Sequence, residues 1–375
     1  MSTVPQTRRI PAIDFARGLS VLMVILVHTL WMYGNPVTQT ETALGSVIHF
    51  IGKGTPMFLI AMGISFTLSR NQSILLSVKR AFYILAIGYL MNFLKFVLPV
   101  LLDTVPNTFI EAYGWAKPVT FEQMLYMLGT GDILQLAGVS LLMMGFIAKL
   151  SKTKYVPLAI ALCIIVSTKE VRGLRVGIMG LDYLLDLFWG AEWNVYFAVF
   201  PWFSFILIGM FFGLWYKETH RNEAYIFTRM TYFGILGLIA GGGLCYYNFD
   251  YHFGDYFHLG PGGTLYLAGF NLLLFGLAYV LVTTLKENPI FRFFYYCSKR
   301  VTTLYVIQWV LICWGMNLFG YQQFGVSGVL ILIPLFTALT LGVHYFVLDP
   351  LLFKRSSGNT KEILDHKKTW SKSPG

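Results

Sequence analysis

The sequence predicts an all-α integral membrane protein of about ten transmembrane helices with both termini in the cytoplasm. Three observations predict this fold class. Hydrophobic residues make up 56% of the 375-residue chain and charged residues only 12%, whereas an average soluble domain is about 25% charged. Apolar runs of about 20 residues, each long enough to cross a hydrocarbon core as a helix, recur along the whole length. Lys and Arg are concentrated in alternate connections between these runs.

Ten apolar segments are expected to span the membrane. In chain order they are approximately Gly18–Tyr33, Leu44–Leu68, Ala81–Leu102, Phe121–Ala148, Tyr155–Thr168, Val195–Tyr216, Met230–Tyr247, Thr264–Leu285, Val301–Phe319 and Ser327–Phe353. No connection between them is long enough to be a domain. We therefore expect residues 1–353 to form a single transmembrane domain and residues 354–375 to form a basic cytoplasmic tail.

The positive charge of the chain indicates orientation. The segment before the first span, every second connection and the tail together hold 22 of the 28 Lys and Arg residues, whereas the opposite connections hold four. By the positive-inside rule the Lys- and Arg-rich side is cytoplasmic. The net charge of +10 therefore predicts a topology and gives no reason to expect a nucleic-acid surface.

The first span carries a polar stripe. His28 lies ten residues beyond Gly18, about 15 Å into the membrane at the helical rise. Arg17 and Asp14 fall near the same helical face, three and four turns before His28. Such a stripe would suit an anionic ligand whose reactive end must reach the centre of the membrane. The alternative is that Asp14 and Arg17 pair as an interfacial anchor and that His28 is a hydrogen-bonded core residue.

Other costly polar side chains lie at similar depth. Asn92 falls in the third span, and Asp132 and Gln135 form an i,i+3 pair expected in the middle of the fourth. His49 and Lys53 precede a Gly-Thr-Pro stretch that should break the second span and open a cavity. For Lys53 the alternative is an ammonium group that reaches the outer surface beside an interfacial histidine.

The remaining polar positions leave two interpretations open. Arg80, Lys299 and Arg300 begin spans on the cytoplasmic side, where they bind an anion or only set orientation. His252 and His258 lie in an outer loop expected to be solvated, with acceptor binding or a weak metal site as alternatives. The four cysteines show no metal-ligand spacing, and no Walker, GxGxxG, GxSxG or HExxH motif occurs, so we expect no metal.

One stretch carries a family resemblance. The segment Arg9-Ile-Pro-Ala-Ile-Asp14-Phe-Ala-Arg17-Gly18, followed by an apolar run to His28, resembles the Asp-x-x-Arg-Gly start of the transmembrane acyltransferase superfamily. This superfamily includes the acyltransferase-3, heparan-alpha-glucosaminide N-acetyltransferase and bacterial YeiB-like families. Shorter likenesses continue across most of the chain, among them Pro56 to Gly63 and Thr303-Leu-Tyr305.

The resemblance implies a multi-pass enzyme, in a bacterial cytoplasmic membrane, that moves an acetyl group from cytoplasmic acetyl-CoA to a sugar hydroxyl or amine on the far side. His28 matches the catalytic histidine of the acyltransferase-3 branch, and His49 and Asp132 are the other candidate bases. The expected CoA-binding residues are Asp14, Arg17, Arg80, Lys299 and Arg300. The expected acceptor-binding or oxyanion-binding residues are Lys53, Asn92, Gln135 and Gln308.

The sequence also departs from the N-acetyltransferase branch. That branch has Asn where this chain has His28. The residues Gln39, Gly52 and Lys53 of this chain also depart from the pattern of that branch. The sequence therefore leaves two questions open. One is whether the acetyl group goes to oxygen or to nitrogen, and the other is whether it is transferred directly or through a covalent acyl-histidine. A non-catalytic transporter or lipid-handling protein, with the same polar groups binding a solute, is the alternative function.

Overall fold

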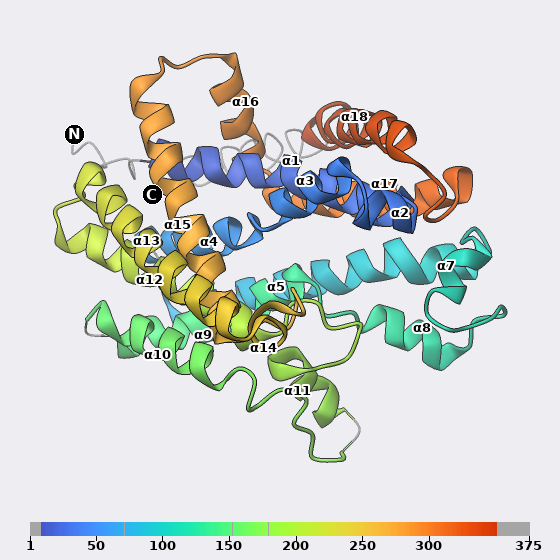
Figure 1. Ribbon diagram of the computed structural model, residues 1–375, viewed down its shortest axis with the longest axis horizontal. Coiled ribbons are helices and arrows are strands. Elements are labelled where there is room, and N and C mark those ends of the chain that lie inside the picture. The colour runs from blue at the N-terminus through green and yellow to red at the C-terminus, as the bar shows by residue number, and fades with distance from the viewer. Residues whose placement is uncertain (1–8, 71, 152, 179, 351–375) are drawn as a thin grey trace, which may run out of the picture.

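The computed structural model describes residues 9–70, 72–151, 153–178 and 180–350. These residues form helices and no β-sheet (Figure 1). The helices are α1 (Pro11–Tyr33), α2 (Pro36–Thr40), α3 (Ala43–Gly52), α4 (Thr55–Leu68), α5 (Ile74–Asn92), π-helix η1 (Phe93–Val97), α6 (Leu98–Leu101), α7 (Asn107–Glu111), α8 (Phe121–Leu128), α9 (Ile133–Leu150), α10 (Tyr155–Ser167), α11 (Leu181–Trp189), α12 (Val199–Glu218), α13 (Glu223–Tyr247), α14 (Phe249–Phe253), α15 (Pro261–Thr284), α16 (Pro289–Ser298), α17 (Val301–Phe319), α18 (Val326–Gly342) and π-helix η2 (Val343–Leu348).

The chain is an all-α multi-pass membrane protein. Within the described ranges, nine helical segments are long and apolar enough to cross a bilayer. The second of them joins α3 to α4, the third joins α5 to α6 through η1, and the last joins α18 to η2. The fifth expected span, Tyr155–Thr168, corresponds to α10, whose 13 residues reach only about 20 Å as a helix.

Several expected boundaries were wrong, among them the start of the seventh span, which is Glu223 and not Met230. The first span begins at Pro11, so Asp14, Arg17 and His28 do lie on one continuous helix. His28 is consequently nearer the far end of α1 than its centre. The third span begins at Ile74, where the Ser73 side chain caps α5. The fourth expected span is interrupted between α8 and α9, because Asp132 caps α9 and so starts a new helix.

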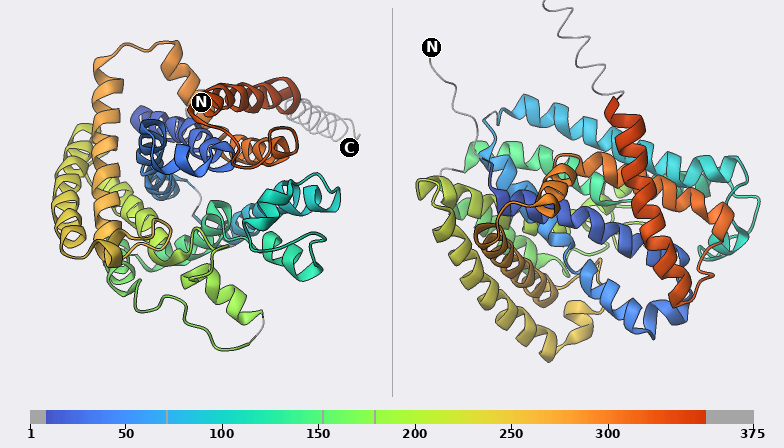
Figure 2. Two further views of the ribbon diagram at one scale, coloured as in Figure 1. Left: turned by 45° about the vertical axis from the view of Figure 1, so that its right-hand side comes forward. Right: turned by 90° about the horizontal axis from the view of Figure 1, so that it is seen from above.

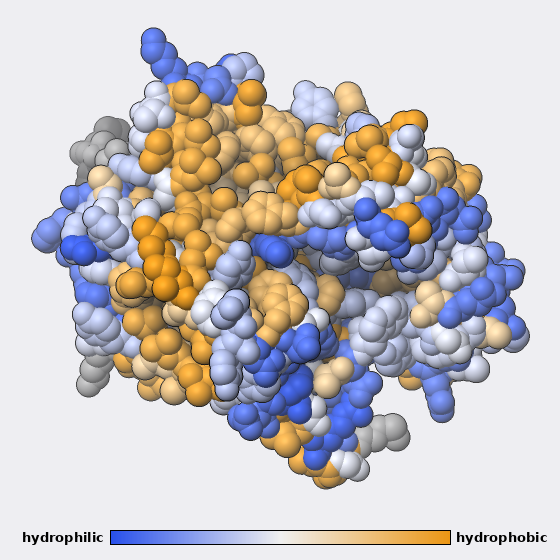
Figure 3. Space-filling model, viewed as in Figure 1, coloured by the Kyte–Doolittle hydropathy of each residue, from blue (hydrophilic) through white to orange (hydrophobic). Residues whose placement is uncertain are grey.

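Helix α1 lies in the middle of the molecule. It contacts α3, α4, α15, α16, α17 and α18, and the α5–α9 pair lies across from it (Figures 1 and 2). Helix α12 is buried almost throughout. By contrast, α13 is mostly exposed, and apolar residues gather over α13 and α15 in Figure 3, whereas polar residues gather around α8 and α11. Helix α13 therefore presents a surface suited to lipid.

Glycines allow the central helices to pack closely. A Cβ atom on Gly63 of α4 would lie 2.0 Å from the Ile206 carbonyl oxygen of α12, and one on Gly209 would lie 2.1 Å from the Ile60 oxygen. Only glycine fits at these two crossings, as is common between membrane helices. The contact between α4 and α12 fixes the start of α4, which borders the candidate site.

Candidate active site

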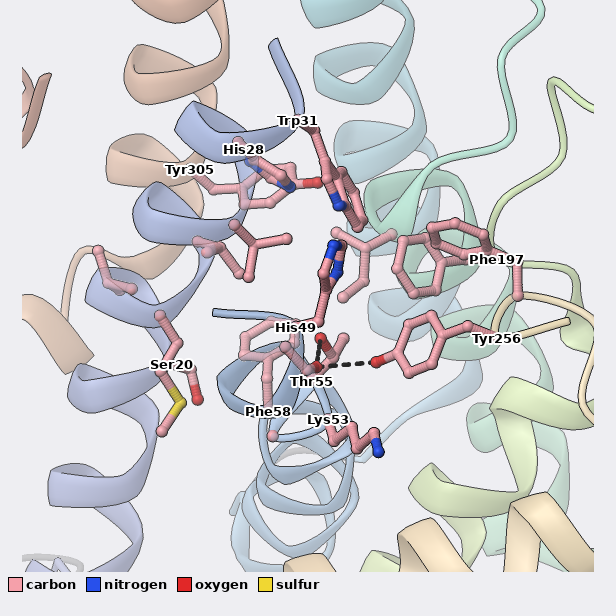
Figure 4. A pocket seen from close by; sticks show the side chains of 18 of the residues that line it. Ser20, His28, Trp31, His49, Lys53, Thr55, Phe58, Phe197, Tyr256 and Tyr305 are labelled. Carbon is pink, nitrogen blue, oxygen red and sulfur yellow. Dashed lines mark hydrogen bonds between the residues drawn. The ribbon is translucent and has the colours of Figure 1, made fainter. Parts of the chain in front are cut away.

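A cavity of about 400 Å³ lies beside α1 (Figure 4). It extends along α1 from Ser20 to Trp31, about 16 Å at the helical rise. Its wall is largely apolar, and it contains no carboxylate. The residues that line it are Ser20, Val21, Met23, Val24, Val27, His28, Trp31, His49, Gly52, Lys53, Gly54, Thr55, Phe58, Ile133, Leu134, Phe197, Phe253, Tyr256, Phe257, Val301, Thr302 and Tyr305.

The predicted break in the second span forms one wall of this cavity. Helix α3 ends at Gly52 and α4 begins at Thr55. The hydroxyl groups of Tyr256 and Thr55 each donate to the Gly52 carbonyl oxygen at 2.8 Å. The Asn271 amide donates to the Lys53 carbonyl oxygen at 2.9 Å. Irregular backbone thus lines a cavity, and these side chains satisfy carbonyl groups that the helix break would otherwise leave unpaired.

His28 faces the cavity with one ring nitrogen available. Its Nδ1 lies 3.1 Å from Oε1 of Gln308, and Nε2 of Gln308 donates to the Tyr305 carbonyl oxygen at 3.0 Å. This second bond fixes the orientation of the Gln308 amide, so its oxygen faces His28 and Nδ1 of His28 must be the donor. Among the described residues the hydrogen bond of His28 is made by Nδ1, and none is made by Nε2. It therefore presents a lone pair, the feature a general base requires.

The imidazole of His28 also lies against a tryptophan. Its ring centroid is 3.7 Å from that of Trp309, and the two planes differ by 22°. Trp309 in turn donates from Nε1 to the hydroxyl oxygen of Tyr305 at 2.9 Å. Two neighbouring residues of α17, Gln308 and Trp309, thus hold the imidazole from two directions.

Asp132 is fully engaged away from the cavity. Its carboxylate accepts from Lys95 Nζ at 2.7 Å, from the Tyr305 hydroxyl at 2.8 Å and from the Ile133 backbone N–H at 2.7 Å. Lys95 is 1% exposed and Asp132 2% exposed. Asp132 does not line the cavity. This geometry gives Asp132 a structural role, whereas the sequence analysis named it as a candidate general base.

Asn92 and Gln135 hold the turn between α8 and α9. The Asn92 amide donates to the carbonyl oxygens of Leu128 and Thr130 at 2.9 and 2.8 Å. Oε1 of Gln135 accepts from the Asp132 backbone N–H at 3.2 Å. Neither residue lines the cavity. They secure the start of α9, and their side chains are not placed to touch an oxyanion there.

His49 and Lys53 do lie on the cavity wall. Figure 4 shows His49 pointing into the space that His28 and Trp31 also face. The Lys53 ammonium lies 5.4 Å from the ring centroid of Phe253, and within the described ranges it has no carboxylate partner. In Figure 4 the Lys53 ammonium points away from His28 and Trp31, toward the other end of the cavity.

The opening motif joins α1 to α16. Asp14 accepts from the Ser298 hydroxyl at 2.9 Å, and a Cβ on Gly18 would lie 2.0 Å from the Phe294 carbonyl oxygen. Asp14 also lies 4.0 Å from Arg9. These two motif residues therefore have packing roles, which was not the CoA-binding role expected of Asp14.

The cations at this end of the molecule differ in their availability. Arg300 pairs with Asp349 at 3.2 Å and lies 4.0 Å over the ring of Tyr296. Arg80 and Lys299 are exposed, and the buried Nε of Arg17 has no partner within the described ranges. Arg17 lies one helical turn before Ser20, where the cavity begins. None of the four lines the cavity itself.

The two histidines of the far loop have structural contacts. His252 Nδ1 accepts from the Gly262 backbone N–H at 3.0 Å. His258 lies 2.6 Å from Asp255 and 3.0 Å from the Val195 carbonyl oxygen. Although burial opposes it, the hydrogen bond from His258 lowers the pKa of Asp255 to about 2. The described residues contain no group of three or more potential metal ligands.

Sequence reasoning missed three residues of the network around His28. Lys95 is a lysine inside a span, a signal that was visible but had been given no role. Tyr305 had been noted only as part of a short motif. Trp309 gives no signal in the sequence, because a tryptophan in an apolar helix is ordinarily a packing residue.

Fold and site together define a multi-pass membrane protein with an internal cavity that offers a histidine lone pair. A family model described as heparan-alpha-glucosaminide N-acetyltransferase, catalytic, matches residues 9–252. The chain belongs to this family, which places it among the membrane acetyltransferases. The match contains α1 to α13 and His28, and it ends before the α17 residues that hold His28. No curated protein matches the sequence.

Proposed function

We propose that this protein transfers an acetyl group from cytoplasmic acetyl-CoA to an amine or hydroxyl of a sugar on the opposite side of the membrane, and that His28 is the general base. The observation that carries the proposal is the free Nε2 of His28 on the cavity wall, with Nδ1 committed to Gln308. Family membership supports acetyl transfer, and the cavity supports a meeting point for two substrates within the membrane.

The reaction is a direct acyl transfer. Nε2 of His28 takes the proton from the acceptor as its nitrogen or oxygen attacks the thioester carbonyl. The bond between acceptor and carbonyl carbon forms, the carbonyl oxygen becomes an oxyanion, and the carbon–sulfur bond then breaks. The CoA thiolate receives the proton from the His28 imidazolium.

Donor and acceptor would reach the site from opposite ends. Arg17, Arg80 and Lys299 suit the phosphates of CoA at the N-terminal end of α1. The thioester arm would enter the cavity beside Ser20 and extend toward His28. The acceptor would enter past Trp31 and His49, which line the cavity (Figure 4), and past Phe257, whose ring centroid lies 5.8 Å from that of Trp31.

Reconstituted vesicles test the proposal. Radiolabelled acetyl-CoA is added on the side that the N-terminus faces, and glucosamine is enclosed on the other side as the probe acceptor. We expect labelled N-acetylglucosamine inside the vesicles from the wild-type protein and none from His28→Asn. Equal labelling by His28→Asn would reject His28 as the base. Glucosamine leaving the vesicles unacetylated would instead support a transporter.

A further inference from the structure

The buried ion pair between Lys95 and Asp132 has no place in the reaction described above. Lys95 lies in the π-helix η1, within the membrane-spanning segment Ile74–Leu101. Both side chains are almost wholly buried. A buried ion pair adds little net stability, because the loss of solvation offsets the attraction. Ionisable residues inside a span and π-helical segments both recur at functional sites, so the pair needs another explanation.

The contacts of this pair lead to His28. Asp132 accepts from the Tyr305 hydroxyl at 2.8 Å, and that hydroxyl accepts from Nε1 of Trp309 at 2.9 Å. The indole ring of Trp309 is the surface against which the His28 imidazole stacks. Lys95 reaches the same indole, since its ammonium lies 4.5 Å from the ring centroid. The ion pair thus holds Trp309 through Tyr305 and also contacts it directly.

The pair also joins separate parts of the chain at this point. Lys95 comes from η1, Asp132 from the start of α9, and Tyr305 and Trp309 from α17. Helix α17 contacts α1 as well as η1. The network therefore fixes α17, with Gln308 and Trp309, between the α5–α9 pair and the helix that carries His28.

We propose that Lys95 and Asp132 are positioning residues that hold Tyr305 and Trp309 so that the His28 imidazole keeps Nε2 directed into the cavity. The proposal rests on the proposed function of His28. Lys95 supplies the countercharge that keeps Asp132 ionised as the acceptor for Tyr305. Without this anchor Trp309 can tilt, and His28 then loses its alignment with the substrates.

Replacing the whole pair separates positioning from stability. In the double variant Lys95→Met/Asp132→Thr both charges are lost together, so no unpaired charge remains, and Thr can still cap α9. We expect unfolding close to that of the wild type and unchanged acetyl-CoA binding. Turnover should fall by about 10- to 100-fold, the cost of misplacing a reacting group. Wild-type turnover in this variant would overturn the proposal.

A second variant covers the case in which the double variant does not fold. Tyr305→Phe removes only the hydroxyl that links Asp132 to Trp309, and we expect a roughly tenfold lower kcat with unchanged KM for acetyl-CoA. Lys117→Met, which breaks the surface pair with Asp103, is the matched control and should retain wild-type turnover. Wild-type kcat in Tyr305→Phe beside an inactive His28→Asn would reject the positioning role alone. An active His28→Asn would reject the proposed function.

Discussion

The two π-helical segments of this protein look alike in composition but differ in what they join. Each carries a buried ionisable residue beside an aspartate, and that aspartate also accepts a hydrogen bond from a tyrosine. In η1, Lys95 pairs with Asp132, which accepts from Tyr305. In η2, His344 lies 3.8 Å from Asp349, and the Tyr296 hydroxyl lies 2.9 Å from His344 and 3.1 Å from Asp349.

Their surroundings separate the two clusters. The η1 cluster leads through Trp309 to His28 and the cavity. The η2 cluster ends at Arg300, which is partly exposed. Although burial opposes it, hydrogen bonds from Arg300 and Tyr296 lower the pKa of Asp349. The η1 cluster therefore includes a cavity-lining residue, Tyr305, whereas Tyr296, Arg300, His344 and Asp349 of the η2 cluster do not line the cavity.

Substitution of His28 and of His344, the buried histidines beside the two clusters, should give the largest contrast. His28→Asn keeps a hydrogen-bonding side chain but cannot accept a proton at neutral pH. We expect its turnover to fall by about 10²- to 10⁴-fold with acetyl-CoA binding retained. His344→Asn should stay within about threefold of wild type, because His344 does not line the cavity. Steady-state turnover of both variants is measured with labelled acetyl-CoA. Equal losses of turnover in both variants would contradict the difference between the two clusters.

Removal of one partner from each cluster should affect stability differently. Lys95→Met leaves the Asp132 carboxylate buried without its cation, and we expect a loss of about 3–5 kcal/mol in the free energy of unfolding. His344→Leu leaves Asp349 paired with Arg300, so its loss should be below about 2 kcal/mol. Denaturant titration of both variants in the same detergent measures the difference. A smaller loss of unfolding free energy for Lys95→Met than for His344→Leu would contradict the expectation that only Asp132 is left without its cation.

Replacing Arg17 of α1 and Arg80 of α5 should distinguish residues that bind the donor from the structural Arg300. Arg17→Ala and Arg80→Ala should each weaken acetyl-CoA binding by about 1.5–3 kcal/mol, the range for hydrogen bonds to charged groups. Added salt should reduce the effect. Arg300→Ala, which loses the contact with Asp349, should leave donor affinity unchanged. Isothermal titration with acetyl-CoA tests all three, and an affinity loss confined to Arg300→Ala would reverse the assignment.

The Asp255–His258 pair in the far loop should give the smallest effect, and it depends on pH. The pKa of Asp255 is about 2 in the folded chain, below the value of about 3.9 for an unfolded aspartate. Its stabilising contribution is therefore present above about pH 4 and is lost as the pH falls toward 2. Because Asp255 is half exposed, we expect at most about 1 kcal/mol. Unfolding of Asp255→Asn and wild type should converge at low pH; a constant difference would show another cause.

The sequence alone determined the fold class, most of the apolar segments that form spans, the helix break after Gly52 and the shared helical face of Asp14, Arg17 and His28. Each of these follows from local composition or from periodicity within one helix. The sequence also predicted the family, which the match over residues 9–252 confirmed.

Only the tertiary structure decided which of these polar residues meet. Gln308 lies 280 positions from His28 yet fixes its tautomer, and Asp132, expected in the middle of a span, caps a helix and anchors Tyr305. Arg300, which the sequence left without a partner, pairs with Asp349. Periodicity shows which residues share a face of one helix, but the contact between faces of distant helices depends on packing, which no local pattern encodes.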